Sequence, residues 1–268
     1  MRMSGNSRMS RKRLAGPGLG LMGILLFLLA WEAVPRLGLV QERFLPPASR
    51  VLNRFFDYLG QPGFWNDVGQ TMLAWGLGLA VSIAAAVVLG LLIGSSQFLR
   101  KATYSTIEFL RPIPSVALIP LAVLLFGVKI ESSLLLVIYA SFWQVLLQVL
   151  YGVADVDPVA ENTARSYRLG RLARIRYVVW PTALPYLMTG IRLASAVALI
   201  LAITAELIIG SPGLGQQIAL TQSGGAVPEM YALILATGLI GVLINVGVRL
   251  IEKRVLAWHI SVRREVAA

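Results

Sequence analysis

Few ionisable side chains lie inside the apolar runs of this sequence, and their types limit the chemistry that the chain can perform. They are Glu108, Arg111, Arg192 and Glu206. Acid-base or nucleophilic catalysis needs His, Asp or Ser side chains clustered in register, and these four residues do not form such a set. The chain has no cysteine, and its single histidine, His259, cannot hold a metal ion alone. A catalytic or metal centre is therefore not expected.

Arg111 is the residue whose chemistry most suggests a binding role. An ionised side chain inside an apolar run costs a few kcal/mol unless it faces a cavity or a partner, so Arg111 is a candidate for attracting an anion. The alternative is that Arg111 pairs with Glu108 at i,i+3, or extends its guanidinium to an interface.

A second group of candidates lies on one later apolar run. Trp143, Gln144 and Gln148 offer an aromatic face and amide groups that could line the same cavity. The competing interpretation is that these side chains join helices by packing and hydrogen bonding. Glu206 is expected to be structural, because a carboxylate would repel an anion.

The long polar segment at 155–185 is the feature around which the apolar runs are arranged. Asp157 can cap a short helix that begins at Pro158, and Glu161 and Arg165 form an i,i+4 pair on it. Gly170 offers a stop. A second helical piece then leads into an apolar run and carries Arg171, Arg174, Arg176, Trp180 and Pro181. Two helices should meet here beside a membrane, although composition alone also allows a merely basic cytoplasmic loop.

Composition predicts the class of protein that holds these residues. Of 268 residues, 57% are hydrophobic and 14% charged, with a mean hydropathy of +0.73. These values are typical of a polytopic membrane protein. The net charge is +11, and the basic residues that produce it lie in loops between apolar runs. This distribution indicates signals for membrane orientation and disfavours a nucleic-acid partner.

The apolar runs predict an all-α protein with about six transmembrane helices. The first run, 19–34, follows a basic stretch and lacks a convincing cleavage site, so it is interpreted as a retained helix. An amphipathic helix on the outer surface should begin near Ser49. The remaining runs cover 69–96, a proline-broken run that ends at 127, then 132–154, 181–210 and 230–251.

The loop charges and the small residues predict orientation and association. Every inside segment is basic, so both termini should be cytoplasmic. Small residues between Gly76 and Gly94 predict close helix contact inside the bundle. A second copy of the chain is expected to supply a partner helix, with a paralogous permease as the alternative. His259 should lie at a membrane interface.

The polar segment resembles the EAA loop of ABC-importer permeases. Counted back from Pro181, the Glu-Ala-Ala of that loop falls on Asn162, Thr163 and Ala164, and its glycine falls on Arg168. The chain departs from the pattern, because Glu161 comes one residue early and Gly170 two residues late. In that family the loop forms a coupling helix that sits in a groove of the ATPase subunit.

Three further stretches resemble the nitrate/sulfonate/taurine branch of these permeases, and with the loop they cover about 69–258. The first is LRPIPSVALIPL, which begins at Leu110 and includes Pro114 and Pro120. The second is the run at 181–196, with Pro185, Gly190 and Arg192. The third combines AEL at 205–207 with GLG at 213–215.

The resemblance implies a type I (MetI-like) permease fold in a bacterial inner membrane and a transport function for a small anion such as a sulfonate, nitrate or taurine. Implied partners are a cytoplasmic ATPase dimer, which binds ATP and Mg, an extracytoplasmic substrate-binding protein, a second permease copy and the lipid bilayer. The chain itself lacks a phosphate-binding G-x-x-x-x-G-K-[ST] loop. The expected coupling residues are Glu161, Asn162, Ala164, Arg165, Arg168 and Gly170. The expected structural or gate residues are Pro114, Pro120, Pro181, Pro185, Arg192 and Glu206.

The sequence is divided accordingly into an N-terminal part at 1–68, a permease core at 69–258 with its coupling loop at 155–180, and a C-terminal tail at 259–268. The alternative function is an ion-gradient-driven secondary transporter or channel. Such proteins usually carry inverted internal repeats, and no convincing repeat relates the two halves of this sequence.

Overall fold

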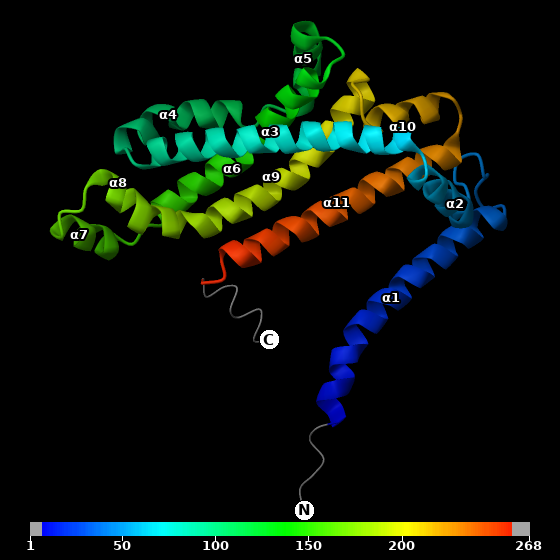
Figure 1. The fold of residues 1–268 in the computed structure, drawn as a ribbon, viewed down its shortest axis with the longest axis horizontal. Coiled ribbons are helices and arrows are strands. Elements are labelled where there is room, and N and C mark those ends of the chain that lie inside the picture. Colours follow the sequence, from blue (N-terminus) through cyan, green and yellow to red (C-terminus); the bar gives the residue numbers. More distant parts are fainter. Residues whose placement is uncertain (1–6, 259–268) are drawn as a thin grey trace, which may run out of the picture.

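The computed structural model describes residues 7–258, and side chains from residue 18 onward; His259 and the tail after it lie outside this range. Within it every regular element is helical. Figure 1 shows four long helices, α3, α6, α9 and α11, running between two ends of the molecule. The short helices α7 and α8 lie at one end and α2 and α10 at the other, while α1 extends away from the body.

Three helices form the main core: α3 (Pro62–Gly94), α6 (Ile130–Ala154) and α9 (Trp180–Ile209). Glycines of α3 lie directly against valines of α6: a Cβ added to Gly78, Gly90 or Gly94 would fall within 2.5–2.7 Å of a Cγ1 atom. The valines concerned are Val137, Val149 and Val153. Backbones that approach this closely gain packing contacts, on which helix association in lipid depends.

This contact corrects the expectation about the small residues between 76 and 94. They do lie inside the bundle, but their partner is α6 of the same chain. They therefore do not argue for a second copy. Gly76 is not part of the contact, since a Cβ there would meet nothing within 4 Å.

The α6–α9 pair is packed in the same way. A Cβ on Gly152 of α6 would lie 2.7 Å from the Cα of Ala183, and one on Gly190 of α9 would lie 3.0 Å from the Cβ of Gln148. Each helix thus lends a glycine to its neighbour, and α6 is fixed between α3 and α9.

A second, smaller core lies at the opposite end from α7 and α8. Helices α10 (Leu214–Ser223) and α11 (Val227–Val255) pack there against the start of α3. Buried residues of this cluster are Phe64, Leu214, Ile218, Leu233 and Ala236. The predicted amphipathic helix is α2 (Ala48–Leu59), which packs on α11 with Val51 buried and Arg54 paired to Glu229 at 3.1 Å.

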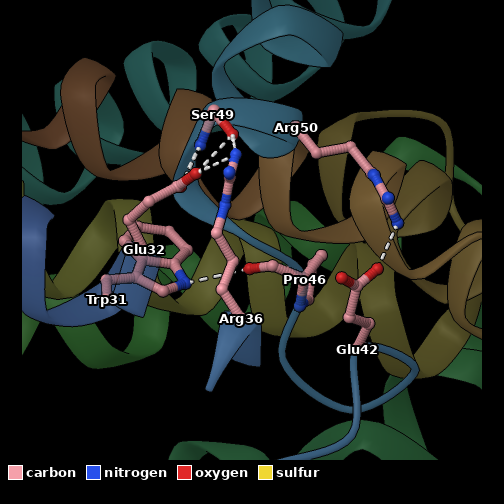
Figure 2. Close-up of polar contacts among 7 residues, drawn as sticks. All are labelled: Trp31, Glu32, Arg36, Glu42, Pro46, Ser49 and Arg50. Atoms are coloured by element: carbon pink, nitrogen blue, oxygen red, sulfur yellow. Dashed lines mark hydrogen bonds and ion pairs between the residues drawn. The ribbon is translucent and has the colours of Figure 1, made fainter. Parts of the chain in front are cut away.

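Helix α1 (Ser7–Arg36) joins the body through its last turns, as Figure 2 shows. Glu32 accepts hydrogen bonds from the backbone N–H and the hydroxyl of Ser49, at 2.9 and 2.8 Å, and pairs with Arg36 at 2.6 Å. The Trp31 indole N–H donates to the carbonyl of Pro46 at 3.1 Å. Glu32 thereby caps the first turn of α2 from another helix, because the residue before α2, Pro47, has no side chain that could do so.

The proline-broken run becomes a bent pair. Helix α4 (Gln97–Leu110) and the segment formed by η1 (Ser115–Leu118) and α5 (Ile119–Phe126) meet at 81°. The described residues contain five helices long and apolar enough to cross a membrane, or up to six if this pair is one span. The expectation of about six spans is confirmed.

Candidate functional site

The polar helix of the 155–185 segment is α7 (Pro158–Ser166), and its beginning is as predicted. The Asp157 carboxylate accepts the backbone N–H of Val159 at 2.8 Å, and Pro158 takes the first position. Arg165 Nε donates to Glu161 Oε1 at 3.1 Å. The same oxygen also accepts Arg174 Nη1 at 2.5 Å, so Glu161 joins α7 to the next helix.

The end of α7 differs from the prediction that Gly170 stops it. The helix ends at Ser166, and Arg168 adopts the left-handed conformation with φ 52°. Arg168 N–H donates to the Arg165 carbonyl and Leu169 N–H to the Ala164 carbonyl, at 2.9 and 3.0 Å, which is the Schellman pattern. Gly170 has φ −60°, which any residue adopts. Arg168 thus occupies the position where a glycine is usual.

The second helical piece leads into the apolar run as predicted, and it does so through a π-helical segment. Helix α8 (Arg171–Arg174), the π-helical segment η2 (Ile175–Val179) and α9 follow one another without a break, so Pro181 starts no new element. A π turn widens the hydrogen-bond ladder just before Pro181, which has no N–H to donate. The Thr182 hydroxyl donates to the Val178 carbonyl at 2.9 Å in the same turn.

The six predicted coupling residues divide into an exposed and a buried set. The exposed set is Asn162, Arg165, Arg168 and Gly170. Ala164 is buried, and the Glu161 side chain is only 24% exposed because it faces Arg174. Ala164 and Glu161 therefore hold α7 in place, whereas the four exposed residues form a surface that a partner protein could contact.

Three of the four predicted pathway residues line one small cavity. Arg111, Trp143 and Gln144 contribute to a cavity of about 180 Å³ between the α4–η1 turn, α6 and α9. With roughly 30 Å³ per water molecule, this volume has room for a small polar solute. Gln148 does not line it and packs against Gly190 instead.

The lining of this cavity is rich in hydrogen-bond donors and carries positive charge. The Trp143 indole nitrogen is buried and has no hydrogen-bond partner. Among the lining residues, Arg111 is the one with a formal charge at neutral pH. The distance from its Nη1 atom to Glu108 Oε1 is long, at 4.0 Å. Cationic and N–H donors without a strong acceptor favour an anion.

Sequence reasoning missed Ser115 and Tyr139, which also line the cavity. Tyr139 lies one turn before Trp143 on the same helix face, so the i,i+4 spacing could have revealed it. Ser115 could not be found this way, because it reaches the cavity only through the bend after Pro114.

The predicted structural residues lie at breaks and between elements. Pro114 precedes η1, Pro120 lies in the first turn of α5, and Pro185 lies inside α9. Arg192 pairs with Glu252 of α11 at 3.3 Å. These contacts agree with a structural role, which stays a prediction.

Glu206 is the centre of a buried node between three segments. Its Oε2 accepts the Thr71 hydroxyl at 2.9 Å and the Gly215 N–H at 3.0 Å, and Thr71 in turn accepts the Leu214 N–H at 3.0 Å. A Cβ on Gly213 would lie 2.3 Å from the Glu206 carboxyl carbon. The glycines of the GLG stretch are thus needed for close approach to the carboxylate of the AEL stretch.

A donor-lined cavity between long apolar helices is suited to passing a polar solute. Over residues 7–258, no three His, Asp or Glu side chains come together as a metal site would need. The fold and the cavity define a membrane permease.

Comparison with known proteins identifies its family. The model described as "Binding-protein-dependent transport system inner membrane component" matches residues 86–257. The chain belongs to this family and is a multi-pass permease subunit of an ABC importer.

Relatives and solved structures agree with this assignment. The chain is 31% identical to the taurine transport system permease protein TauC of Escherichia coli K12, over 90% of this chain and 89% of the relative. It is 26% identical to the putative aliphatic sulfonates transport permease protein SsuC of Bacillus subtilis 168, over 86% and 84%. An inward-facing structure of the MetNI methionine ABC transporter matches with a TM-score of 0.62 at 16% identity, over 73% of this chain and 99% of that one. This last likeness confirms the MetI-like fold.

Proposed function

We propose that the chain forms the translocation pathway of an ATP-driven importer for a small organic or inorganic anion of the sulfonate, taurine or nitrate type. The observation that carries the proposal is the cavity shared by Arg111, Trp143 and Gln144. An anion passing it would accept hydrogen bonds from the guanidinium and the amide, beside the Trp143 ring. The relatives named for taurine and aliphatic sulfonates support an anionic cargo.

Energy comes from a partner in this proposal. ATP and Mg are bound by a cytoplasmic ATPase dimer, and no cofactor is bound by this chain. Helix α7 is the coupling helix, and its exposed residues Asn162, Arg165 and Arg168 contact the ATPase. Both termini lie in the cytoplasm, because α7 and the basic loops face the same side. An extracytoplasmic binding protein delivers the cargo to the opposite end, near α2 and α10.

The proposed assembly contains two copies of this chain. Helix α4 has no buried residue, and α5 buries only Ala122. The two helices and α6 line an open apolar groove of about 860 Å³, with side chains such as Leu121, Phe126 and Phe142. A helix of a second copy would fill it with apolar side chains. Mass measurement of the purified complex should give two copies of one permease, and one copy or two different permeases would contradict this.

Uptake into proteoliposomes tests the pathway. The importer is assembled with its ATPase and binding protein, and a ligand screen of that binding protein, starting with taurine and other sulfonates, supplies the labelled cargo. Arg111→Gln and Gln144→Leu should reduce uptake while the complex still assembles and hydrolyses ATP. Gln148→Leu is the matched control, because Gln148 lies outside the cavity, and it should transport normally.

Wild-type uptake by both cavity variants would remove the cavity from the pathway. Uptake by the isolated chain under an ion gradient, without the ATPase, would favour the secondary-transporter alternative.

A further inference from the structure

A second polar cavity, of about 350 Å³, lies between α7 and the ends of two spans. Its walls come from the last residues of α3 and α6, from α7, and from α8 with η2. It is separate from the Arg111 cavity and shares no lining residue with it. The apolar spans α3 and α6 end at this cavity, on the side of the molecule where a chain that leaves the membrane meets its polar headgroups.

The cavity holds more positive than negative charge. Arg165, Arg171 and Arg174 line it with a single carboxylate, Glu161. One oxygen of Glu161 accepts both Arg165 and Arg174, whereas Arg171 makes a 3.3 Å hydrogen bond to the Ser95 hydroxyl. One carboxylate can neutralise one of three guanidiniums, so an excess of about two positive charges faces the cavity.

Unused donors accompany this charge. The Nε atom of Arg174 is buried and has no hydrogen-bond partner, although its Nη1 is bound to Glu161. A buried donor of a charged group is costly to leave unpaired. Asp157 cannot supply an acceptor, because it is not a lining residue and its carboxylate caps α7. Within the lining residues, Glu161 is thus the carboxylate that Arg165 and Arg174 share, and Arg171 has a neutral hydroxyl as its partner.

The remaining lining is apolar and narrows the class of ligand. Val153, Val156, Ile175 and Val179 lie beside the arginines. Guanidiniums bind phosphate oxygens through paired N–H donors, and basic pockets between transmembrane helices on the cytoplasmic side bind anionic headgroups. A phosphodiester with attached hydrocarbon satisfies both the cationic and the apolar surfaces.

We propose that this cavity binds the phosphodiester headgroup of an anionic phospholipid of the inner leaflet. The headgroup accepts hydrogen bonds from Arg171, the charge of Arg174 faces it across the cavity, and its acyl chains leave along the apolar side. Bound in this way, the single negative charge of the phosphodiester offsets about half of the excess charge under α7, and the lipid fixes α7 against the ends of α3 and α6.

Lipid retention by the full-length permease tests the proposal without any measurement of transport. The protein is placed in nanodiscs that contain equal amounts of phosphatidylglycerol and phosphatidylcholine, then transferred to mild detergent for native mass spectrometry. The wild type should retain phosphatidylglycerol preferentially, and Arg171→Gln should retain about fivefold less, as expected for one arginine near a lipid phosphate. Arg176→Gln is the matched control, because Arg176 is an exposed neighbour that does not line the cavity.

Equal retention by the wild type and Arg171→Gln, or an equal loss in Arg176→Gln, would overturn the proposal. A second arm uses nanodiscs of phosphatidylcholine alone with millimolar inorganic phosphate. If phosphate raises the Tm of the wild type but not of Arg171→Gln, and no lipid preference is seen, the ligand is a free oxyanion and the lipid assignment is wrong. Loss of bound phosphatidylglycerol when the ATPase binds would instead assign the cavity to that subunit.

Discussion

Arg168 holds a left-handed backbone conformation that an L-residue with a Cβ adopts at a cost of about 1–2 kcal/mol. Arg168→Gly should therefore raise the stability of the permease by up to about 1 kcal/mol, after about 0.4–1 kcal/mol is offset by the greater freedom of glycine in the unfolded chain. Thermal unfolding of the detergent-purified protein measures the change. Gly170→Ala is the control and should be tolerated, because Gly170 has φ −60° and open space around it. A higher Tm for Gly170→Ala than for Arg168→Gly would show that the left-handed residue of this turn is not Arg168.

The Glu206 node gives the second prediction at the scale of single residues. Glu206→Ala removes the acceptor for the Thr71 hydroxyl and the Gly215 N–H, and each buried unpaired group costs about 1–3 kcal/mol. The Tm should fall by several degrees, and α10 should become more accessible to protease. Glu42→Ala is the comparison, since Glu42 is exposed and its pair with Arg50 at 2.9 Å is worth about 0–1 kcal/mol. Equal effects of the two substitutions would argue against the node.

At the scale of elements, the packing of α3 on α6 depends on single glycines. Gly90→Ala would place a Cβ 2.6 Å from Val149 Cγ1, so the helices must separate or repack at a cost of about 1–3 kcal/mol. Gly76→Ala lies on the same helix, meets no atom within 4 Å and should be neutral. Thermal unfolding of the two variants compares them directly. Val149→Ala added to Gly90→Ala should restore part of the loss, and no recovery would contradict the proposed contact.

The elements themselves were largely predictable from sequence. Apolar runs located the spans, and Asp157 with Pro158 located the start of α7, because hydropathy and capping act locally. The breaks were harder. The sequence places the end of α7 at Gly170, because glycine is the usual residue at a helix end. In the structure Arg168 takes the left-handed conformation instead, held by the bonds from Arg168 N–H and Leu169 N–H to the carbonyls of Arg165 and Ala164. The continuity through Pro181 depends on a π turn that has no sequence signature.

The candidate site was predictable only in part, because some of its residues are brought together by tertiary packing and not by local sequence signals. Arg111, Trp143 and Gln144 stood out by residue type within apolar runs. Ser115 enters the cavity through the 81° bend between α4 and α5, which depends on tertiary packing. The amide of Gln148 makes it a candidate for the pathway in the sequence, but its close contact with Gly190 directs the side chain into the α6–α9 interface.

At the scale of the whole molecule, helix α7 and the segment around α10 lie at opposite ends of the long helices (Figure 1). A subunit that couples a cytoplasmic ATPase to a pathway needs this polarity, with its coupling helix at one end and the entry for cargo at the other. Site-specific cross-linking can test this arrangement cleanly, because the chain has no cysteine and a single introduced thiol is unique.

The most direct test places that thiol on α7. Asn162→Cys, at an exposed position, is labelled with a maleimide cross-linker whose second group reacts with lysine, in the complex of permease, ATPase and binding protein. Gln222→Cys, exposed on α10, is the matched control. We expect Asn162→Cys to cross-link to the ATPase and Gln222→Cys to leave it unlinked. Cross-linking of the ATPase from Gln222→Cys but not from Asn162→Cys would contradict the assignment of α7 as the coupling helix.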